Sequence, residues 1–193
     1  MTFGPDAVIA CPSCGAPERV FTLRTSNNFF DSYWTDGYAS RPCAWAQPEL
    51  TRCHACGRFY WLEDAPVLGR MPERGRKRWF LDVDGIQEEE EPREAVPEAW
   101  EKAPQVTRCG VEALLEALAA GVADTEEREI LLRTQVLWIS NHKNRNPRRK
   151  RDRQKTPQAR KNMVALLALH RVSICRGMGP RRCRRIPPRL PSA

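Results

Sequence analysis

The chain has 193 residues, of which 41% are hydrophobic and 29% are charged, and its formal net charge at pH 7 is +8. This composition predicts a soluble protein of one or two small domains, and no apolar run approaches the roughly 18 residues that a membrane-spanning helix needs. The charge is unevenly distributed, because residues 141–193 contain 17 Lys and Arg and one acidic residue. Residues 1–140 therefore contain 15 basic and 23 acidic residues, which predicts an acidic body with a basic end.

The N-terminal sequence, MTFGPDAVIACPSC, has no basic segment followed by a long apolar stretch, so the sequence predicts no signal peptide. We therefore expect a cytoplasmic protein. In that compartment, closely spaced cysteines bind metal more often than they form disulfides.

Residues 1–65 contain two Cys-x-x-Cys pairs and most of the aromatic residues, and they show little helical periodicity. Between the pairs, aromatic and β-branched residues are frequent, and the dipeptides and tripeptides NN, TDG and RP mark turns. Alternation predicts strands over 18–24 and 32–38, and a third over 56–64. We expect a small antiparallel sheet.

The two cysteine pairs have the same form, CPSCG and CHACG, and 38 residues separate Cys14 from Cys53. The two-residue gap lets the chain fold over one metal ion so that both sulfurs face it, and the following Gly permits the positive φ that such a turn needs. A tetrahedral structural zinc site needs two such turns. The sequence therefore predicts a Zn²⁺ site made by Cys11, Cys14, Cys53 and Cys56. Iron in a rubredoxin-like site uses the same ligands, and the sequence leaves that alternative open.

The two Cys-x-x-Cys-Gly knuckles resemble those of a zinc ribbon, over residues 8–63. The whole arrangement is similar to uncharacterised bacterial proteins that join an N-terminal zinc ribbon to a C-terminal helical region. The resemblance implies a metal site and a small antiparallel sheet, to which the WTDG segment and the aromatic run after the second knuckle belong. It implies no reaction.

The other cysteines do not extend this pattern. Cys43 lies between the knuckles without a partner at ligand spacing, Cys109 is expected at the start of a helix, and Cys175 and Cys183 lie near the C-terminus. His54 lies inside the second knuckle and could replace a ligand, but four cysteines already close a tetrahedral shell.

Residues 66–106 are predicted to be a linker. Pro and Gly recur at close intervals in its first part, and an acidic run interrupted by prolines follows. Such a segment buries little apolar surface and is usually solvated. The alternative is an acidic surface that docks a specific partner.

Residues 107–170 change to a helical period. The leucines of VEALLEALAAG predict a helix over 111–121, which its final Gly terminates. A second helix is predicted over 124–142, because Asp124 and Glu127 have the spacing of a capping box. The apolar residues on one face of each helix are typical of packing surfaces rather than cofactor sites.

A third helix is predicted over 156–170, with Thr156 as its N-cap and Pro157 as its first residue. The loop before it, residues 142–155, is the basic run HKNRNPRRKRDRQK. The chain as a whole is therefore expected to have an α+β fold, with a small sheet followed by a linker and a short all-α region.

Residues 171–193 contain seven Arg, four Pro and two Cys, no acidic residue, and no regular spacing of apolar residues. Such a segment buries too little to order itself, which predicts a disordered basic tail without stable structure. A second interpretation is out-of-frame translation, because a GC-rich gene read in the wrong frame yields this mixture of residues. The coding DNA separates the two: an amphipathic helical pattern in another frame beyond codon 170 would support the second.

The function predicted from these features is not catalytic. A closed shell of four cysteines leaves no position for water or substrate, so the metal is expected to be structural. The sequence contains none of the common phosphate-binding, zinc-protease or hydrolase motifs. We expect no enzyme but a protein-interaction module with an unknown protein partner. The alternative is a nucleic-acid-binding protein that neutralises phosphates with the basic segment 142–155.

Overall fold

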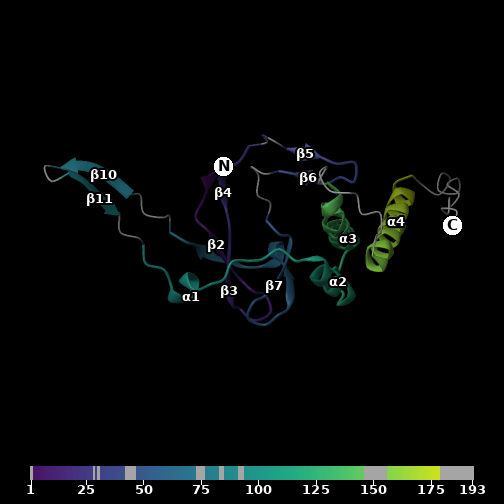
Figure 1. Ribbon diagram of the computed structural model, residues 1–193. Coiled ribbons are helices and arrows are strands. Elements are labelled where there is room, and N and C mark those ends of the chain that lie inside the picture. The colour runs from purple at the N-terminus through teal and green to yellow at the C-terminus, as the bar shows by residue number, and fades with distance from the viewer. Residues whose placement is uncertain are drawn as a thin grey trace. The chain divides into compact units, whose positions relative to one another are not determined.

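A computed structural model of the chain describes residues 2–27, 29, 31–41, 47–72, 77–82, 85–90, 94–145 and 156–178, with only the backbone at 77–82, 85–90, 143–144 and 171–178. The chain divides into two compact units, the N-terminal unit, Met1–Cys109, and the helical unit, Gly110–Ala193. Antiparallel sheets come first in the chain and the longer helices follow, which confirms the predicted α+β class (Figure 1).

The strands of the N-terminal unit are short. They are β1 (Thr2–Phe3), β2 (Ala7–Ala10), β3 (Pro17–Val20), β4 (Leu23–Thr25), β5 (Ser32–Tyr33), β6 (Ala39–Ser40), β7 (Leu50–Arg52), β8 (Phe59–Trp61), β9 (Val67–Arg70), β10 (Lys77–Asp82) and β11 (Gly85–Glu90). In the order β3-β2-β9 they form a three-stranded sheet, and β1 pairs with β4, β5 with β6, β7 with β8 and β10 with β11. All of these pairings are antiparallel.

The core of this unit lies where the three-stranded sheet meets the β7–β8 hairpin. Its buried side chains include two of the predicted metal ligands together with Ile9, Val20, Tyr60, Ala65 and Val106. A core of this size buries little apolar area, so a metal ion bound by its two cysteines would contribute strongly to its stability.

Two of the predicted strands are interrupted. Residues 18–24 form β3 and β4 rather than one strand, because β3 pairs with β2 and β4 pairs with β1. Between the two strands, the hydroxyl of Thr22 donates to the carbonyl of Pro5 at 2.7 Å. Residues 32–38 were predicted as one strand, but they contain the turn of the β5–β6 hairpin. That turn has Gly37 at φ 78°, a value that glycine adopts far more readily than other residues.

The segment predicted as a linker, 66–106, is hydrogen-bonded at both ends to the sheet that contains β2 and β3. At its start, β9 pairs with β2. At its end, the N–H of Arg19 donates to the carbonyl of Pro104 at 2.8 Å, and the N–H of Val106 donates to the carbonyl of Arg19 at 2.9 Å. Within the segment, the backbone of β10 pairs with that of β11. Composition could not reveal these pairings, because the ladders use backbone groups that every residue except proline can supply.

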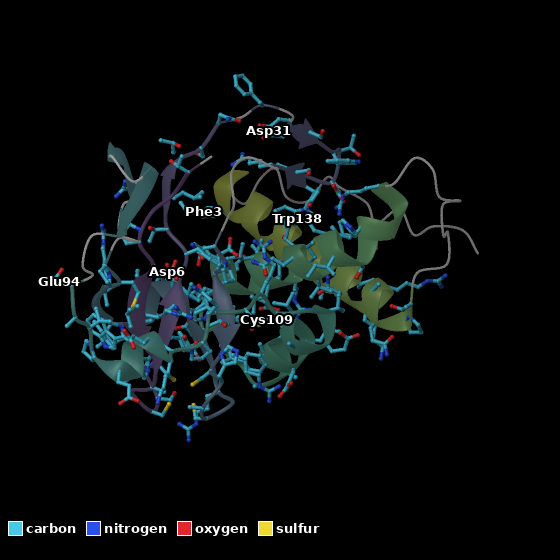
Figure 2. The ribbon with its side chains drawn as sticks, turned by 60° about the vertical axis from the view of Figure 1, so that its left-hand side comes forward. Phe3, Asp6, Asp31, Glu94, Cys109 and Trp138 are labelled. Carbon is cyan, nitrogen blue, oxygen red and sulfur yellow. The ribbon has the colours of Figure 1, made fainter. Side chains whose placement is uncertain are left out.

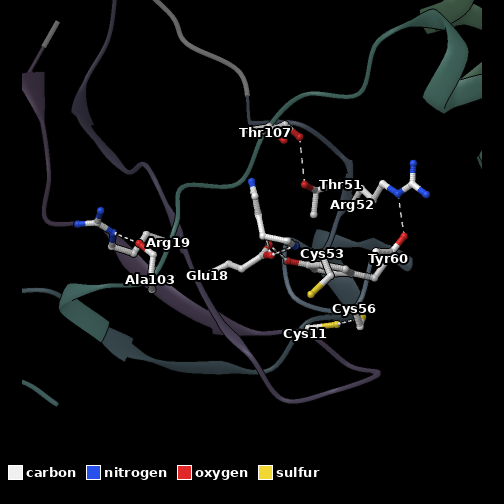
Figure 3. Close-up of polar contacts among 12 residues, drawn as sticks. Cys11, Glu18, Arg19, Thr51, Arg52, Cys53, Cys56, Tyr60, Ala103 and Thr107 are labelled. Atoms are coloured by element: carbon white, nitrogen blue, oxygen red, sulfur yellow. Dashed lines mark hydrogen bonds and ion pairs between the residues drawn. The ribbon is translucent and has the colours of Figure 1, made fainter. Parts of the chain in front are cut away.

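Side chains also attach residues 103–109, here called the return segment, to the strands of the N-terminal unit. Arg19 Nε donates to the carbonyl of Ala103 at 2.8 Å, and the hydroxyl of Thr51 donates to the carbonyl of Thr107 at 3.0 Å (Figure 3). Asp6, labelled in Figure 2, accepts a hydrogen bond at 2.6 Å from the side-chain amide of Gln105. The return segment is therefore part of the N-terminal unit.

The short helix α1 (Glu98–Glu101) precedes the return segment, and its Trp100 side chain packs on the sheet. Trp100 covers Gly69 of β9 so closely that a Cβ atom added at Gly69 would lie 2.5 Å from the indole ring. A side chain at that position would displace the indole ring, so the close approach requires glycine.

The helical unit contains α2 (Val111–Ala119), α3 (Glu126–Asn141), the 3₁₀ turn η2 (His142–Arg145) and α4 (Pro157–Met178). A further 3₁₀ turn, η1 (Leu62–Asp64), belongs to the N-terminal unit. Helix α2 packs against α3, and α3 packs against α4. The side chains buried in these contacts are Leu114, Ala117, Leu132, Val136, Ala159, Asn162 and Leu166. The three predicted helices are confirmed.

The predicted C-terminus of α2 and the predicted N-cap of α4 are confirmed, whereas the predicted N-cap of α3 is wrong by one residue. Gly121 follows α2 at φ 70°, and the hydroxyl of Thr156 caps α4 by accepting from the N–H of Ala159 at 3.2 Å. The N-cap of α3 is Thr125, whose hydroxyl accepts at 3.2 Å from the third N–H of the helix, and not Asp124. Asp124 instead forms an ion pair with Arg128 one turn later.

Helix α4 continues to Met178, so the prediction that residues 171–193 lack stable structure is wrong for 171–178. Once a helix is nucleated, each further residue adds a hydrogen bond at little cost, and residues 171–178 contain no proline. The next two residues of the sequence are Gly179 and Pro180, a pair that ends helices. Residues 179–193 lie outside the described residues, as do residues 146–155 of the predicted basic run and residues 73–76, 83–84 and 91–93 of the predicted linker.

Candidate metal centre

The four predicted metal ligands come together in space. One ligand atom from each of Cys11, Cys14, Cys53 and Cys56 lies within 4.8 Å of the others. The sulfurs of Cys11 and Cys56 are 3.8 Å apart, and those of Cys14 and Cys53 are 3.7 Å apart. A tetrahedral ion with metal–sulfur bonds of about 2.3 Å holds its sulfurs about 3.8 Å from one another. The spacing of the donor set therefore fits one tetrahedral ion of the size of zinc.

The two knuckles have the same backbone geometry. The glycines that close them, Gly15 and Gly57, have φ values of 73° and 71°. Their N–H groups donate to the carbonyls of Cys11 and Cys53 at 2.8 and 2.9 Å, and the N–H groups of those cysteines bond to the carbonyl five residues later, at 2.9 Å. This repeated turn places both sulfurs of each pair on the same side of the chain, as the Cys-x-x-Cys-Gly spacing predicts.

Backbone N–H groups point at the sulfurs and favour their ionised form. The N–H of Arg58 lowers the pKa of the Cys56 thiol to about 7. Burial raises the pKa of Cys53 to about 12, although the N–H groups of Ala55 and Cys56 act in the opposite direction. A bound cation would favour thiolates at every position, because a coordinating thiol loses its proton.

The cluster has a buried side and an exposed side. Cys11 and Cys53 are buried in the core, whereas Cys14 and Cys56 are exposed. The first cysteine of each knuckle thus anchors the centre in the core, and the second lies at the surface. All four are free thiols rather than disulfides.

Arg52 braces the second knuckle from the strand that precedes it. Its Nε donates to the carbonyl of Gly57 at 2.8 Å, and its guanidinium carbon lies 5.0 Å from the centre of the Phe59 ring. The contact spans the knuckle from β7 to β8 and fixes the loop that carries Cys53 and Cys56 (Figure 3).

Glu18 is a buried carboxylate beside the cluster, and no sequence motif marks it. It is 1% exposed and lies on β3, four residues after Cys14. Its Oε1 accepts from the backbone N–H of His54 at 2.8 Å and lies 3.1 Å from His54 Nδ1, and its Oε2 accepts from the hydroxyl of Tyr60 at 2.5 Å (Figure 3). Because these partners are 36 and 42 residues away in sequence, no local pattern could reveal them.

The environment of Glu18 determines the roles of its two partners. Burial raises the pKa of Tyr60, and the hydrogen bond to Glu18 raises it further, so the phenol stays protonated and donates. The ring of His54 lies against Glu18 rather than among the four sulfurs, which agrees with the expectation that His54 is not a ligand.

Of the other cysteines, only Cys109 has a described side chain, and it does not join the cluster. Cys109 is buried directly before the N-cap of α2, and its thiol donates to the carbonyl of Leu50 at 3.6 Å (Figure 2). Burial raises the pKa of this thiol, so it stays protonated and packs as a small apolar side chain. Cys43 and Cys183 lie outside the described residues, and Cys175 lies in α4, where only the backbone is described.

None of the helices described is long and apolar enough to span a membrane. Comparison with models of known protein families, with curated proteins and with solved structures finds no match to this chain. The metal centre therefore rests on the convergence of the four cysteines and on the geometry of the turns that carry them.

Proposed function

We propose that this chain is a non-enzymatic, cytoplasmic, zinc-containing binding protein whose zinc ion is structural and whose partner is another protein. The observation that carries the proposal is the set of four thiols within 4.8 Å of one another. Four thiolates complete a tetrahedral shell and leave no position at which the ion could bind water or substrate. Zinc is the usual occupant of such a site in a protein without a redox role.

The size of the N-terminal core supports a structural role for the ion. The two buried cysteines belong to the core itself, together with a few apolar side chains from β2, β3, β8 and the return segment. Metal binding to such a site is coupled to folding, because the ligands are brought together only when the sheet forms. The zinc ion would thus supply folding energy that the small core lacks.

The helical unit supports a role in protein binding. The buried face of α4 carries Ala159, Asn162 and Leu166, whereas Val164 and Leu167 on another face of the same helix are exposed. The side chain of Asn162 fixes α4 on α3 by donating to the carbonyl of Arg133 at 2.8 Å. Contiguous exposed apolar patches are typical of surfaces that bind other proteins, and Val164 and Leu167, three positions apart, are neighbours on this face of α4.

Two measurements test this proposal. Metal analysis of the purified full-length chain is expected to give one zinc per chain. Titration against a labelled DNA duplex and a labelled single strand at two salt concentrations is expected to give no binding at micromolar protein. Salt-sensitive binding in that assay would instead support the alternative, a nucleic-acid-binding protein that uses the basic segment 142–155, because phosphate contacts weaken as salt rises.

A further inference from the structure

The two knuckles differ in the residue that follows the first cysteine. In the first knuckle this residue is Pro12, which has no backbone N–H. In the second knuckle it is His54, which has one. Since the two turns otherwise share their hydrogen bonds and their glycine φ values, the second knuckle has one more donor to satisfy than the first.

The hydrogen bonds of the second knuckle show where that donor is satisfied. Residues 53–57 have five backbone N–H groups, of which two point at the sulfur of Cys53 and two bond to carbonyls of the same hairpin. The fifth belongs to His54 and bonds outside the hairpin, to Oε1 of Glu18 at 2.8 Å. The β2–β3 hairpin, which carries the first knuckle, thus supplies through Glu18 the acceptor that the second knuckle lacks.

Burying a carboxylate is unfavourable unless hydrogen bonds replace the lost water. Glu18 is 1% exposed, and its two oxygens accept from His54 and Tyr60, both on the second hairpin. Each partner lies next to the metal centre: His54 follows Cys53 directly, and Tyr60 belongs to the same buried core. The carboxylate is therefore placed to fix the position of the second knuckle relative to the first.

We propose that Glu18 is a positioning residue for the metal centre, which holds the second knuckle in its metal-binding shape by accepting the N–H of His54. This inference rests on the proposed metal site and names a residue that acts on it without contacting the ion. A carboxylate on the β2–β3 hairpin thereby helps to align Cys53 and Cys56 with Cys11 and Cys14 as the unit folds around the ion. Residues that orient metal ligands in this way typically contribute about 10-fold to 100-fold to metal affinity.

The first knuckle offers a direct test, because its Pro12 shows that the turn accepts proline at this position. In a Glu18→Leu variant, the N–H of His54 loses its acceptor and the affinity for metal is expected to fall about tenfold or more. A second change, His54→Pro, removes the N–H itself. The double variant is expected to recover most of the lost affinity, although it has lost the same carboxylate.

The experiment measures the affinity of the full-length chain for Zn²⁺ by competition with a chelator, and follows Co²⁺ binding by the absorption of the thiolate–cobalt bands. Glu94→Gln, a change to an exposed carboxylate of the same unit, is the matched control and is expected to leave affinity unchanged. At saturating Co²⁺ every variant is expected to give the same spectrum, because all four sulfur ligands remain.

Three results would overturn the inference: unchanged affinity in Glu18→Leu, a loss that His54→Pro does not reduce, or an altered Co²⁺ spectrum at saturation. If Glu18→Leu does not fold, the same comparison is made in Glu18→Gln, which keeps one carbonyl acceptor and is expected to lose less affinity. Failure of the unaltered chain to bind metal at all would refute the proposed function instead, so the two failures are distinguishable.

Discussion

The sulfurs of Cys14 and Cys53 lie 3.7 Å apart, although 39 positions separate these residues in the sequence. Cys14 belongs to the exposed side of the cluster and Cys53 to the buried side, so the contact joins the two knuckles across the site. Four thiols at this spacing would repel one another once ionised, and a cation among them removes that repulsion. The N-terminal unit and its metal centre are therefore expected to form together.

The first prediction concerns loss of one buried ligand. Cys53→Ser is expected to abolish stoichiometric zinc and to unfold the N-terminal unit while the helices of Gly110–Ala193 survive, because the units are separately compact. Metal analysis and amide NMR spectra check this. Cys109→Ser, which changes a buried thiol outside the cluster, is the control and is expected to keep its zinc. Full zinc content in the Cys53→Ser variant would refute the ligand assignment.

The second prediction concerns the return segment. Val106 is 9% exposed and belongs to the core of the N-terminal unit, whereas Val67 on β9 is 69% exposed. An unpaired buried charge costs several kcal/mol, so Val106→Asp is expected to destabilise the unit by about 3 kcal/mol or more. Val67→Asp is expected to change stability by less than about 0.5 kcal/mol. Denaturant unfolding of zinc-loaded protein measures both, and equal effects would show that residues 103–109 are not part of this core.

The third prediction concerns Tyr60 and pH. Tyr60→Phe leaves the Oε2 atom of Glu18 without its donor at 2.5 Å, which is expected to cost about 1–3 kcal/mol at pH 8. Because the folded protein raises the pKa of Tyr60 above its unfolded value of about 10, the stability due to this residue is present below pH 10 and lost as pH rises beyond it.

The difference in unfolding free energy between wild type and Tyr60→Phe is therefore expected to shrink by about 1 kcal/mol from pH 8 to pH 11. Denaturant unfolding of the zinc-loaded proteins at the two pH values measures it. Tyr33→Phe, at a tyrosine that is 69% exposed, serves as control and is expected to change the unfolding free energy by less than about 0.5 kcal/mol at pH 8. If the difference in unfolding free energy stays constant or grows with pH, the Tyr60 phenol is not buried in its protonated form.

The fourth prediction uses two adjacent leucines of α4. Leu166 is 7% exposed, whereas Leu167 is 57% exposed. Leu166→Ala is expected to destabilise the helical unit by about 2–4 kcal/mol, because it leaves a cavity in a packed contact. Leu167→Ala is expected to cost less than about 1 kcal/mol. Thermal unfolding followed by circular dichroism checks the pair, and the reverse order would show that α4 packs by another face.

The parts of the structure that the sequence predicts are those with local patterns. Each knuckle is a five-residue turn, so its spacing and its glycine specify it without reference to the rest of the fold, and the three helices follow from apolar spacing over a few turns. Strand pairing is not local. Strand β9 follows Pro66 in a segment with the composition of a linker, and only its pairing with β2 makes it a strand.

The same distinction applies to the candidate site. The four cysteines could be found by their spacing, whereas Glu18 could not, because an isolated glutamate in a predicted strand is usually exposed. Its role depends on His54 and Tyr60, which reach it only in the folded unit. The choice between Asp124 and Thr125 as N-cap also escaped prediction, because both residue types cap helices well and differ here by a single position.

The most direct test of the metal centre is X-ray absorption at the zinc edge of the purified full-length chain, with zinc content measured on the same sample. The predicted result is one zinc per chain with four sulfur neighbours at about 2.3 Å and no nitrogen or oxygen in the first shell. Substoichiometric zinc, or a shell with fewer than four sulfurs, would contradict a closed structural site formed by Cys11, Cys14, Cys53 and Cys56.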